Sequence, residues 1–357
     1  MAQRRLVKGN EAIALGALHG GCDAFFGYPI TPQNEVPEIL SEILPANGRV
    51  FLQAESELAS INMVYGAAAA GKRAMSSSSS PGISLMMEGL SYIAGAELPC
   101  VVVNVQRGGP GLGNIAASQS DYFQACKGGG HGDYEMIVLA PWNVQEMYEF
   151  TRDAFGLADK YRVPAFVLSD AVLGSMLESA AIPEEVPEVK PPPKPWATNG
   201  RNGRTERTII NSLYLDPQDL SDHNDKLQAV YRRIHENEQR YDTRFADDAE
   251  VMVVAYGICA RLALSGIKLA REQGIKVGLF RPITVNPFPY APLRELLGRM
   301  RGAWTFELSA GQMVQDVRLS APERCPVEFF GKMGGILPPP AEVCERIKKF
   351  AETVHGS

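Results

Sequence analysis

The sequence predicts an α/β protein with a mainly parallel sheet that is covered by helices on both faces. Over residues 6–180, short apolar runs alternate with segments of helical periodicity, the pattern of consecutive strand–helix units. The run Cys100–Val105 consists mainly of valine, as expected of a strand buried on both faces. A second alternation begins at residue 250 and predicts a smaller α/β domain.

Within residues 6–180 the strands are the short apolar runs and the helices are the segments between them. The predicted strands are Ala24–Gly27, Val50–Gln53, Lys72–Ser76, Cys100–Val105, Ile137–Leu139 and Ala165–Leu168. The predicted helices are Glu11–Gly20, Glu35–Leu44, Glu57–Ala70, Ile83–Glu97 and Val144–Tyr161. Because ligands bind at the carboxyl ends of the strands in such sheets, the turns after the strands are the candidates for a functional site.

Changes in composition divide the chain into a first domain at residues 1–180, a proline-rich linker with a charged helical insertion at 181–248, and a second domain at 249–357. The linker should be extended and semi-rigid. Apolar residues at helical spacing among alternating charges predict a long helix at Asp225–Tyr241, on the surface or on a partner. The second domain is predicted to contain the strands Glu250–Gly257, Val277–Phe280, Ala303–Glu307 and Val327–Phe330 and the helix Cys259–Gln273.

The composition excludes several classes of function. The net charge of −6 gives no indication of binding to nucleic acid or to an anionic membrane surface. No uninterrupted apolar segment approaches the roughly 20 residues that span a bilayer, so a cytoplasmic location is expected. The six cysteines are scattered without any C-x-x-C pair, so we expect neither an iron–sulfur cluster nor another metal site on this chain.

The turn after the first predicted strand reads Tyr28-Pro29-Ile30-Thr31-Pro32. Thr31 is expected to cap the next helix, with Pro32 at its first helical position. Such a turn gathers a hydroxyl and free backbone N–H groups, which suit an anion. An ordinary connector between a strand and a helix has the same pattern, so this turn alone does not decide the function.

Further candidates lie at the starts of helices and after strands. Glu57 opens an apolar helix, Ser80 is expected to cap a helix that has Pro81 at its first position, and Arg107 follows a buried strand. Each has an ordinary structural alternative, such as a helix-dipole contact for Glu57 or a surface ion pair for Arg107. The glycine-rich loop 127–134 fits no phosphate-binding motif. Spacing alone predicts an α/β enzyme subunit with an anion site.

Several motifs carry more information than their spacing. The segment 28–32 resembles the YPITP motif of the 2-oxoacid:ferredoxin oxidoreductases, which are thiamine diphosphate enzymes that include pyruvate:ferredoxin oxidoreductase. The other segments that resemble this family are 53–57, 79–82, 85–88, 106–110, 118–134, 281–289 and 307–312. The resemblance implies a thiamine-diphosphate-enzyme pyrimidine-type domain followed by a transketolase-C-terminal-like domain. Segment 118–134 looks most like the branched-chain (3-methyl-2-oxobutanoate) and related subfamily.

The resemblance also implies roles for the residues that bind the substrate. Thr31 resembles the threonine that contacts the substrate carboxylate, and Arg107 resembles the arginine that pairs with this carboxylate through its planar fork. Tyr28 and Ile30 belong to the same motif and are expected to contact the substrate.

Cofactor contacts follow from the same resemblance. Glu57 aligns with the glutamate that hydrogen-bonds the thiamine pyrimidine ring and favours its imino form, so it is the expected catalytic residue. Pro29 and Ser80 are expected to contact the cofactor. The Gly-Asp-Gly segment with a downstream Asn that binds Mg and the diphosphate is absent from the sequence. The chain therefore looks like an α-type subunit whose partner holds the diphosphate.

The implied reaction is oxidative decarboxylation of a 2-oxoacid to acyl-CoA and CO2 with reduction of ferredoxin. The implied partners are a β-type subunit with thiamine diphosphate, Mg and a [4Fe-4S] cluster, a γ-type subunit, coenzyme A and ferredoxin; a small ferredoxin-like subunit is a further candidate. A branched-chain 2-oxoacid is the expected substrate. The alternatives are 2-oxoglutarate, an aromatic 2-oxoacid, or a non-catalytic scaffold subunit with the same fold.

Overall fold

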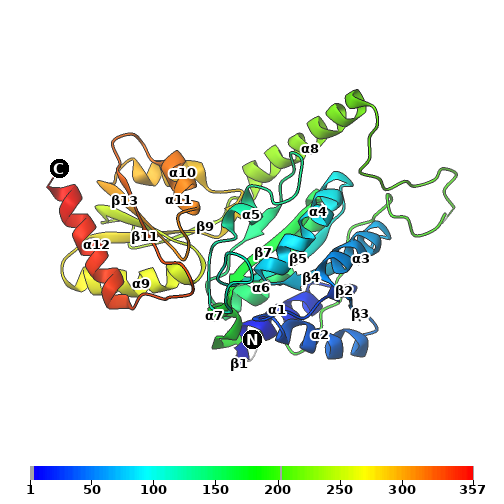
Figure 1. Ribbon diagram of the computed structural model, residues 1–357, viewed down its shortest axis with the longest axis horizontal. Helices are drawn as coiled ribbons and strands as arrows, with labels where there is room; N and C mark the ends of the chain where they lie inside the picture. The colour runs from blue at the N-terminus through cyan, green and yellow to red at the C-terminus, as the bar shows by residue number, and fades with distance from the viewer. Residues whose placement is uncertain (1–3, 202, 357) are drawn as a thin grey trace.

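The computed structural model describes residues 4–201 and 203–356, and its larger sheet has seven strands (Figure 1). In spatial order these are β12 (Thr284–Asn286), β6 (Ile137–Leu139), β7 (Pro164–Asp170), β5 (Cys100–Gln106), β4 (Ala74–Ser78), β2 (Ala24–Gly27) and β3 (Val50–Gln53). All neighbouring strands are parallel except β12 and β6. Every residue of β5 is buried, as the valine-rich run predicts for a central strand.

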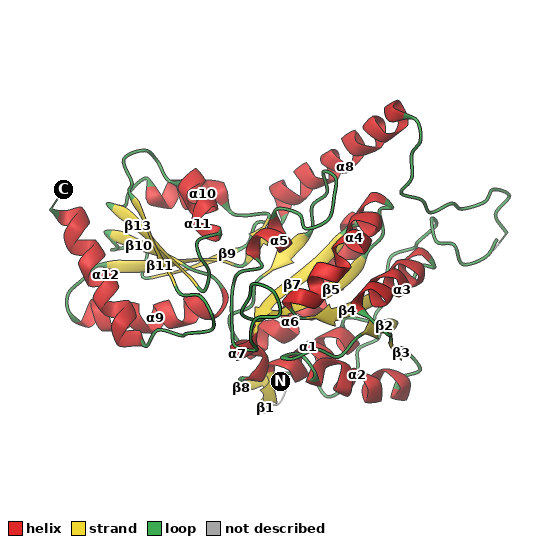
Figure 2. Ribbon diagram, viewed as in Figure 1, coloured by secondary structure: helices red, strands yellow, loops and turns green. Residues whose placement is uncertain are grey.

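Helices cover both faces of this sheet (Figure 2). They are α1 (Gly9–His19), α2 (Glu35–Ala46), α3 (Glu57–Ala69), α4 (Ser80–Gly95), α5 (Tyr122–Cys126), α6 (Val144–Tyr161) and α7 (Ala171–Ser175). Helix α1 packs against α2 and α6, while α3 packs against α4. The predicted α/β architecture with a mainly parallel sheet is confirmed.

A second, five-stranded sheet forms the C-terminal part of the molecule. Its order is β14 (Val327–Gly331), β13 (Gly302–Glu307), β10 (Val251–Val254), β11 (Val277–Pro282) and β9 (Tyr241–Arg244), of which only β9 is antiparallel to its neighbour. Helices α9 (Gly257–Glu272) and α12 (Pro340–His355) pack together, as do α10 (Tyr290–Leu297) and α11 (Met313–Ser320). The sequence prediction missed β9, because its pairing with β11 is a tertiary contact.

The two parts of the chain share one sheet through β12. This strand lies within residues 249–357, yet it pairs with β6 and completes the seven-stranded sheet. A further pair, β1 (Arg4–Lys8) and β8 (Leu177–Ala181), forms a small antiparallel sheet. The division at 1–180, 181–248 and 249–357 stays a prediction.

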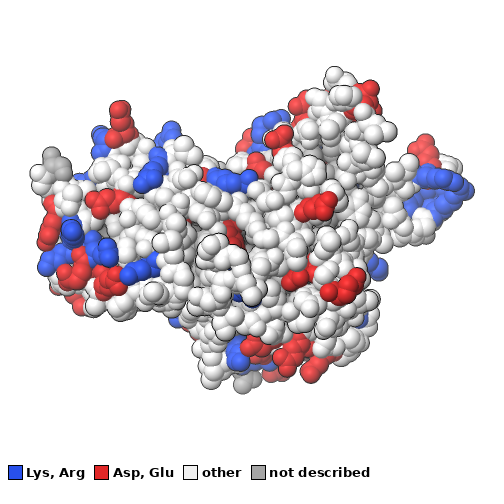
Figure 3. Space-filling view, in the orientation of Figure 1, with Lys and Arg blue, Asp and Glu red and all other residues white. Residues whose placement is uncertain are grey.

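The insertion contains an extended loop followed by α8 (Pro217–Asn237), a helix that begins earlier than predicted. Leu227, Tyr231 and Ile234 are its buried residues, so one face of the helix packs on the protein and the other faces solvent. The loop before α8 projects from the body, and Lys and Arg side chains gather at its tip (Figures 1 and 3). Within the described residues, none of the helices combines the length and hydropathy that a membrane span requires.

Candidate active site

The structure brings Arg107 and Thr31 together at the carboxyl ends of β5 and β2. Arg107 is only 6% exposed, and its Nη1 donates to the backbone oxygen of Thr31 at 2.8 Å. Its Nη2 donates to the backbone oxygen of Leu112 at 3.1 Å. The Nε atom is buried without a hydrogen-bond partner among the described residues. A guanidinium carries five N–H groups, so Arg107 retains donors for an additional acceptor.

Thr31 does not cap a helix, which corrects the sequence prediction. Helix α2 begins at Glu35 and its N-cap residue is Asn34, so Pro32 is not its first helical residue. The reason is that residues 30–33 form a separate turn, in which the Gln33 nitrogen donates to the Ile30 oxygen at 3.1 Å, and the Pro32 oxygen accepts from the Asn10 side chain. The Thr31 hydroxyl accepts a hydrogen bond from Asn34 Nδ2 at 3.2 Å.

Buried amides fix the turn that carries Thr31. Asn10, which is fully buried, donates through Nδ2 to the backbone oxygen of Pro32 at 2.8 Å. Gln33 is also fully buried, and its Oε1 accepts from Ser77 Oγ at 2.6 Å. The carbonyl of Thr31 therefore has a defined position in front of Arg107. Within this turn, Tyr28 and Pro29 are exposed and Ile30 is half-buried.

Glu57 is a buried carboxylate at the first position of α3, where it is 5% exposed. Ser56 caps this helix by accepting from the backbone nitrogen of Ala59. Among the residues that the structure describes, the Glu57 carboxylate accepts one hydrogen bond, a long one of 3.4 Å from Ser78 Oγ. A Cβ atom at Gly82 would lie 2.3 Å from Glu57 Oε1, so glycine at position 82 gives this carboxylate its space.

Ser80 is not the cap of α4, which is a second correction. It is the first helical residue, and Ser79 occupies the N-cap position without a side-chain hydrogen bond. The Ser80 hydroxyl instead accepts from the backbone nitrogen of Arg107 at 3.0 Å and donates to Asp121 Oδ2 at 2.5 Å. The sequence prediction missed Asp121, since nothing in the local pattern indicates this contact across 41 residues.

Comparison with known proteins identifies the family of this chain. Residues 15–243 match the family described as pyruvate flavodoxin/ferredoxin oxidoreductase, thiamine diphosphate-binding, and residues 249–343 match core domain II of pyruvate:ferredoxin oxidoreductase. The chain is 52% identical to the ketoisovalerate oxidoreductase subunit VorB of Methanothermobacter thermautotrophicus, over 97% of this chain and 98% of that protein. The chain belongs to the 2-oxoacid:ferredoxin oxidoreductase family.

Other relatives in this family are more distant. The 2-oxoglutarate synthase subunit KorA of Archaeoglobus fulgidus is 38% identical, with 99% of each chain covered. The solved structure of 2-oxoglutarate:ferredoxin oxidoreductase from Magnetococcus marinus, with 2-oxoglutarate, coenzyme A and succinyl-CoA bound, has a TM-score of 0.86 and 27% identity. That match covers 98% of this chain and 66% of the other chain. A split-gene transketolase with a TM-score of 0.60 and 16% identity supports the predicted fold class.

The residues present fit the pyrimidine side of the family's cofactor, thiamine diphosphate. That ring needs a carboxylate that is shielded from water and can still accept a hydrogen bond. Glu57 is buried, and within the described residues its carboxylate accepts one long hydrogen bond, so it meets both requirements. Among the described residues, no group of three or more His, Cys, Asp or Glu side chains could hold a metal ion.

A cavity of about 400 Å³ opens beside the site, between the first and second domains. Its walls include Ser80 and Asp121 from the first domain and Ser309, Gln312 and Met333 from the second. Burial raises the pKa of the Asp121 carboxyl, against the opposing effect of its hydrogen bonds from Ser80 and Asn104. This cavity therefore lies where residues 80–121 meet residues 308–334.

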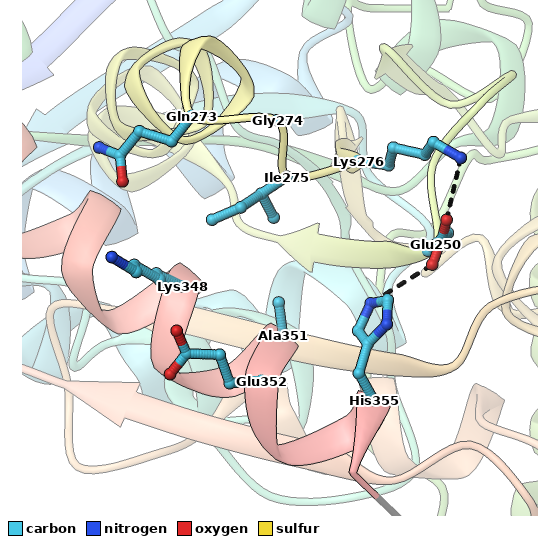
Figure 4. A pocket seen from close by; sticks show the side chains of 9 residues that line it. All are labelled: Glu250, Gln273, Gly274, Ile275, Lys276, Lys348, Ala351, Glu352 and His355. Atoms are coloured by element: carbon cyan, nitrogen blue, oxygen red, sulfur yellow. Dashed lines mark ion pairs between the residues drawn. The ribbon is translucent and has the colours of Figure 1, made fainter.

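A second cavity, of about 420 Å³, lies at the far end of the smaller sheet (Figure 4). Glu250 and Lys276 directly precede β10 and β11, so this cavity is at the amino ends of these strands. Its charges largely neutralise one another, because Glu250 pairs with Lys276 at 3.1 Å and with His355 at 3.3 Å. Ligands of α/β sheets bind at the opposite, carboxyl edge, and we assign no role in the reaction to this cavity.

The packing around Glu57 leads to a prediction for Gly82→Ala. The added Cβ would lie 2.0 Å from Ser78 Oγ, so we expect overpacking to lower the free energy of unfolding by about 1–3 kcal/mol. Gly66→Ala is the matched control, since this helical glycine in α3 has no neighbouring atom within 4 Å of an added Cβ; it should be neutral or stabilising. Urea unfolding of both variants gives the comparison, and equal stability would contradict the tight packing.

Proposed function

We propose that this chain supplies the substrate-carboxylate pocket and the pyrimidine-side contacts of a thiamine diphosphate-dependent 2-oxoacid:ferredoxin oxidoreductase. The observation that carries the proposal is the buried guanidinium of Arg107. Both of its hydrogen-bond acceptors are backbone oxygens, and no carboxylate pairs with it among the described residues. Because an uncompensated buried charge is unfavourable, this position favours an anionic ligand.

The carboxylate of a 2-oxoacid matches this position. The planar fork of Arg107 binds a carboxylate through two parallel hydrogen bonds. Thr31, whose backbone already contacts the guanidinium, contributes its hydroxyl to the same carboxylate. Tyr28 and Ile30 precede Thr31 in the turn and contact the rest of the substrate.

Glu57 acts on the cofactor in this proposal. Thiamine diphosphate, when bound, supplies the nucleophilic carbon that adds to the 2-oxo group and stabilises the charge left after loss of CO2. Glu57 hydrogen-bonds the pyrimidine ring and holds the proton that is exchanged there. Pro29 and Ser80 border the cofactor in this proposal.

The diphosphate and Mg are assigned to a β-type partner that also carries a [4Fe-4S] cluster. A γ-type subunit, a small ferredoxin-like subunit, ferredoxin and coenzyme A complete the assembly, for which we propose a cytoplasmic location. Large apolar side chains on segments that border the site support a covering partner. The exposed ones are Leu58, Leu85, Leu112, Ile115 and Met333.

A branched-chain 2-oxoacid is the proposed substrate. The support is the difference in identity, which is 52% to the VorB subunit of a ketoisovalerate oxidoreductase and 36–38% to KorA subunits of 2-oxoglutarate synthases. Specificity for 2-oxoglutarate or for an aromatic 2-oxoacid is the alternative. The presence of Thr31, Glu57 and Arg107 after strands that end at one edge of the sheet argues against a non-catalytic scaffold.

The first prediction concerns substrate choice. The complex isolated with its natural partners is assayed by viologen reduction with a panel of 2-oxoacids. We expect 3-methyl-2-oxobutanoate to exceed 2-oxoglutarate and phenylglyoxylate in kcat/KM by roughly tenfold or more. A pocket that fits a branched apolar side chain discriminates on this scale against substrates with an unmatched polar or bulky group. A preference for 2-oxoglutarate would overturn the substrate class, and an inactive complete complex would favour the scaffold.

A second prediction concerns Arg107→Ala. Loss of the charge-paired contact should weaken 2-oxoacid binding by about 2–4 kcal/mol, which raises KM roughly 30- to 800-fold. Arg301→Ala is the matched control, since this arginine is 55% exposed and pairs with Glu250, which precedes β10 at the opposite edge of the smaller sheet. An unchanged KM in Arg107→Ala, with normal assembly, would remove Arg107 from the substrate pocket.

A further inference from the structure

Residues 107–121, which connect β5 to α5, form a loop that is bonded to both domains; we call it the bridging loop. It begins at Arg107 and ends at Asp121. The backbone nitrogen of Gly108 donates to the oxygen of Ala116 at 2.9 Å, so the loop folds back on itself. Its tip reaches the second domain, where Asn114 Nδ2 donates to the oxygen of Gly334 at 3.0 Å.

Gln119 fixes the end of the bridging loop to the second domain. Its side chain is 1% exposed, and both of its polar atoms are used. Nε2 donates to the oxygen of Tyr256 at 2.9 Å, and Oε1 accepts from the nitrogen of Leu308 at 3.1 Å. The Gln119 nitrogen also donates to the oxygen of Leu308 at 2.9 Å. These carbonyls and N–H groups follow β10 and β13, so the second domain determines where residue 119 lies.

Asp121, two residues later, contacts the first domain. Its Oδ2 accepts from Ser80 Oγ at 2.5 Å and from Asn104 Nδ2 at 2.9 Å. Its backbone nitrogen donates to Gln106 Oε1 at 3.1 Å. Since the Ser80 hydroxyl also accepts from the Arg107 nitrogen, hydrogen bonds connect Asp121 to the backbone of the arginine.

The guanidinium depends on the same loop. Arg107 Nη2 donates to the oxygen of Leu112, and Nη1 donates to the oxygen of Thr31. The bridging loop therefore supplies one of the two backbone oxygens that orient the Arg107 side chain. It also supports the backbone of Arg107 through Asp121 and Ser80. A displacement of the loop would move the guanidinium relative to Thr31.

We propose that the second domain positions the carboxylate-binding arginine through the bridging loop, with Gln119 and Asp121 as positioning residues. The proposal rests on the proposed role of Arg107. The pairing of a guanidinium with a carboxylate is sensitive to the placement of the guanidinium, because the geometry of two parallel hydrogen bonds tolerates little displacement. The second domain is thus part of the substrate site without contacting the substrate.

The test uses the complex assembled with its partner subunits. Asp121→Ala removes the acceptor for Ser80 and Asn104, so we expect KM for the 2-oxoacid to rise at least fivefold, with kcat changing by less than twofold. Asp121→Asn retains a side-chain oxygen of the same reach and should restore KM to within twofold of wild type. An unchanged KM in Asp121→Ala would overturn the proposal, as would an Asp121→Asn variant as impaired as the alanine variant.

A double variant separates positioning from other roles. In the Arg107→Ala background, Asp121→Ala should raise KM by less than a further twofold, because the residue it positions is absent. A full fivefold effect in this background would show that Asp121 acts independently of Arg107. That result would overturn the positioning proposal and leave the proposed function intact. If Arg107→Ala by itself leaves KM unchanged, the proposed function fails at that earlier step.

Ser80→Ala and Gln119→Met provide the same test if Asp121→Ala does not assemble. Ser80→Ala removes only the hydroxyl between Asp121 and Arg107. Gln119→Met keeps the chain length and the backbone bond to Leu308 but loses both side-chain hydrogen bonds to the second domain. Both should raise KM at least fivefold in the wild-type background and less than twofold in the Arg107→Ala background. Additive effects for both variants would overturn the proposal.

Discussion

The burial of Arg107 without a carboxylate partner among the described residues is the constraint on which the candidate site depends. A guanidinium in a protected position needs acceptors for its N–H groups and a compensating charge. Backbone oxygens of Thr31 and Leu112 supply acceptors, but neither supplies a charge. The anionic ligand that we propose would satisfy the remaining requirement, and the turn at Thr31 would limit where this anion can lie.

The α/β architecture explains how these groups meet. Parallel strands β2, β4 and β5 end at the same edge of the sheet, so the turns after them converge although they lie far apart in sequence. Glu57 joins them from the start of α3, where Gly82 leaves room for its carboxylate. The second domain closes the edge through the bridging loop. Arg107 is thus held by the turn at Thr31 and by the bridging loop, while its Nε atom has no hydrogen-bond partner within the described part of the chain.

Much of the framework could be predicted from the sequence, and the contacts within the site could not. Strands β2, β3 and β6 and helix α6 have the predicted bounds, because each is an apolar or periodic segment between clear breaks. The predicted cap at Thr31 was wrong, since residues 30–33 form a separate turn whose Pro32 oxygen is bonded to Asn10, 22 residues away in the sequence. The bond between Gln119 and Leu308 joins residues 189 apart, and β12 pairs with a strand of the other domain. No local pattern encodes such partners.

The most direct measurement is a crystal structure of the assembled enzyme with its 2-oxoacid bound. Our account predicts that the substrate carboxylate lies within hydrogen-bond distance, about 2.7–3.2 Å, of the Arg107 guanidinium and the Thr31 hydroxyl. It also predicts that Glu57 contacts the pyrimidine ring of the cofactor. A partner-subunit carboxylate paired with Arg107, with the substrate bound elsewhere, would contradict the central claim.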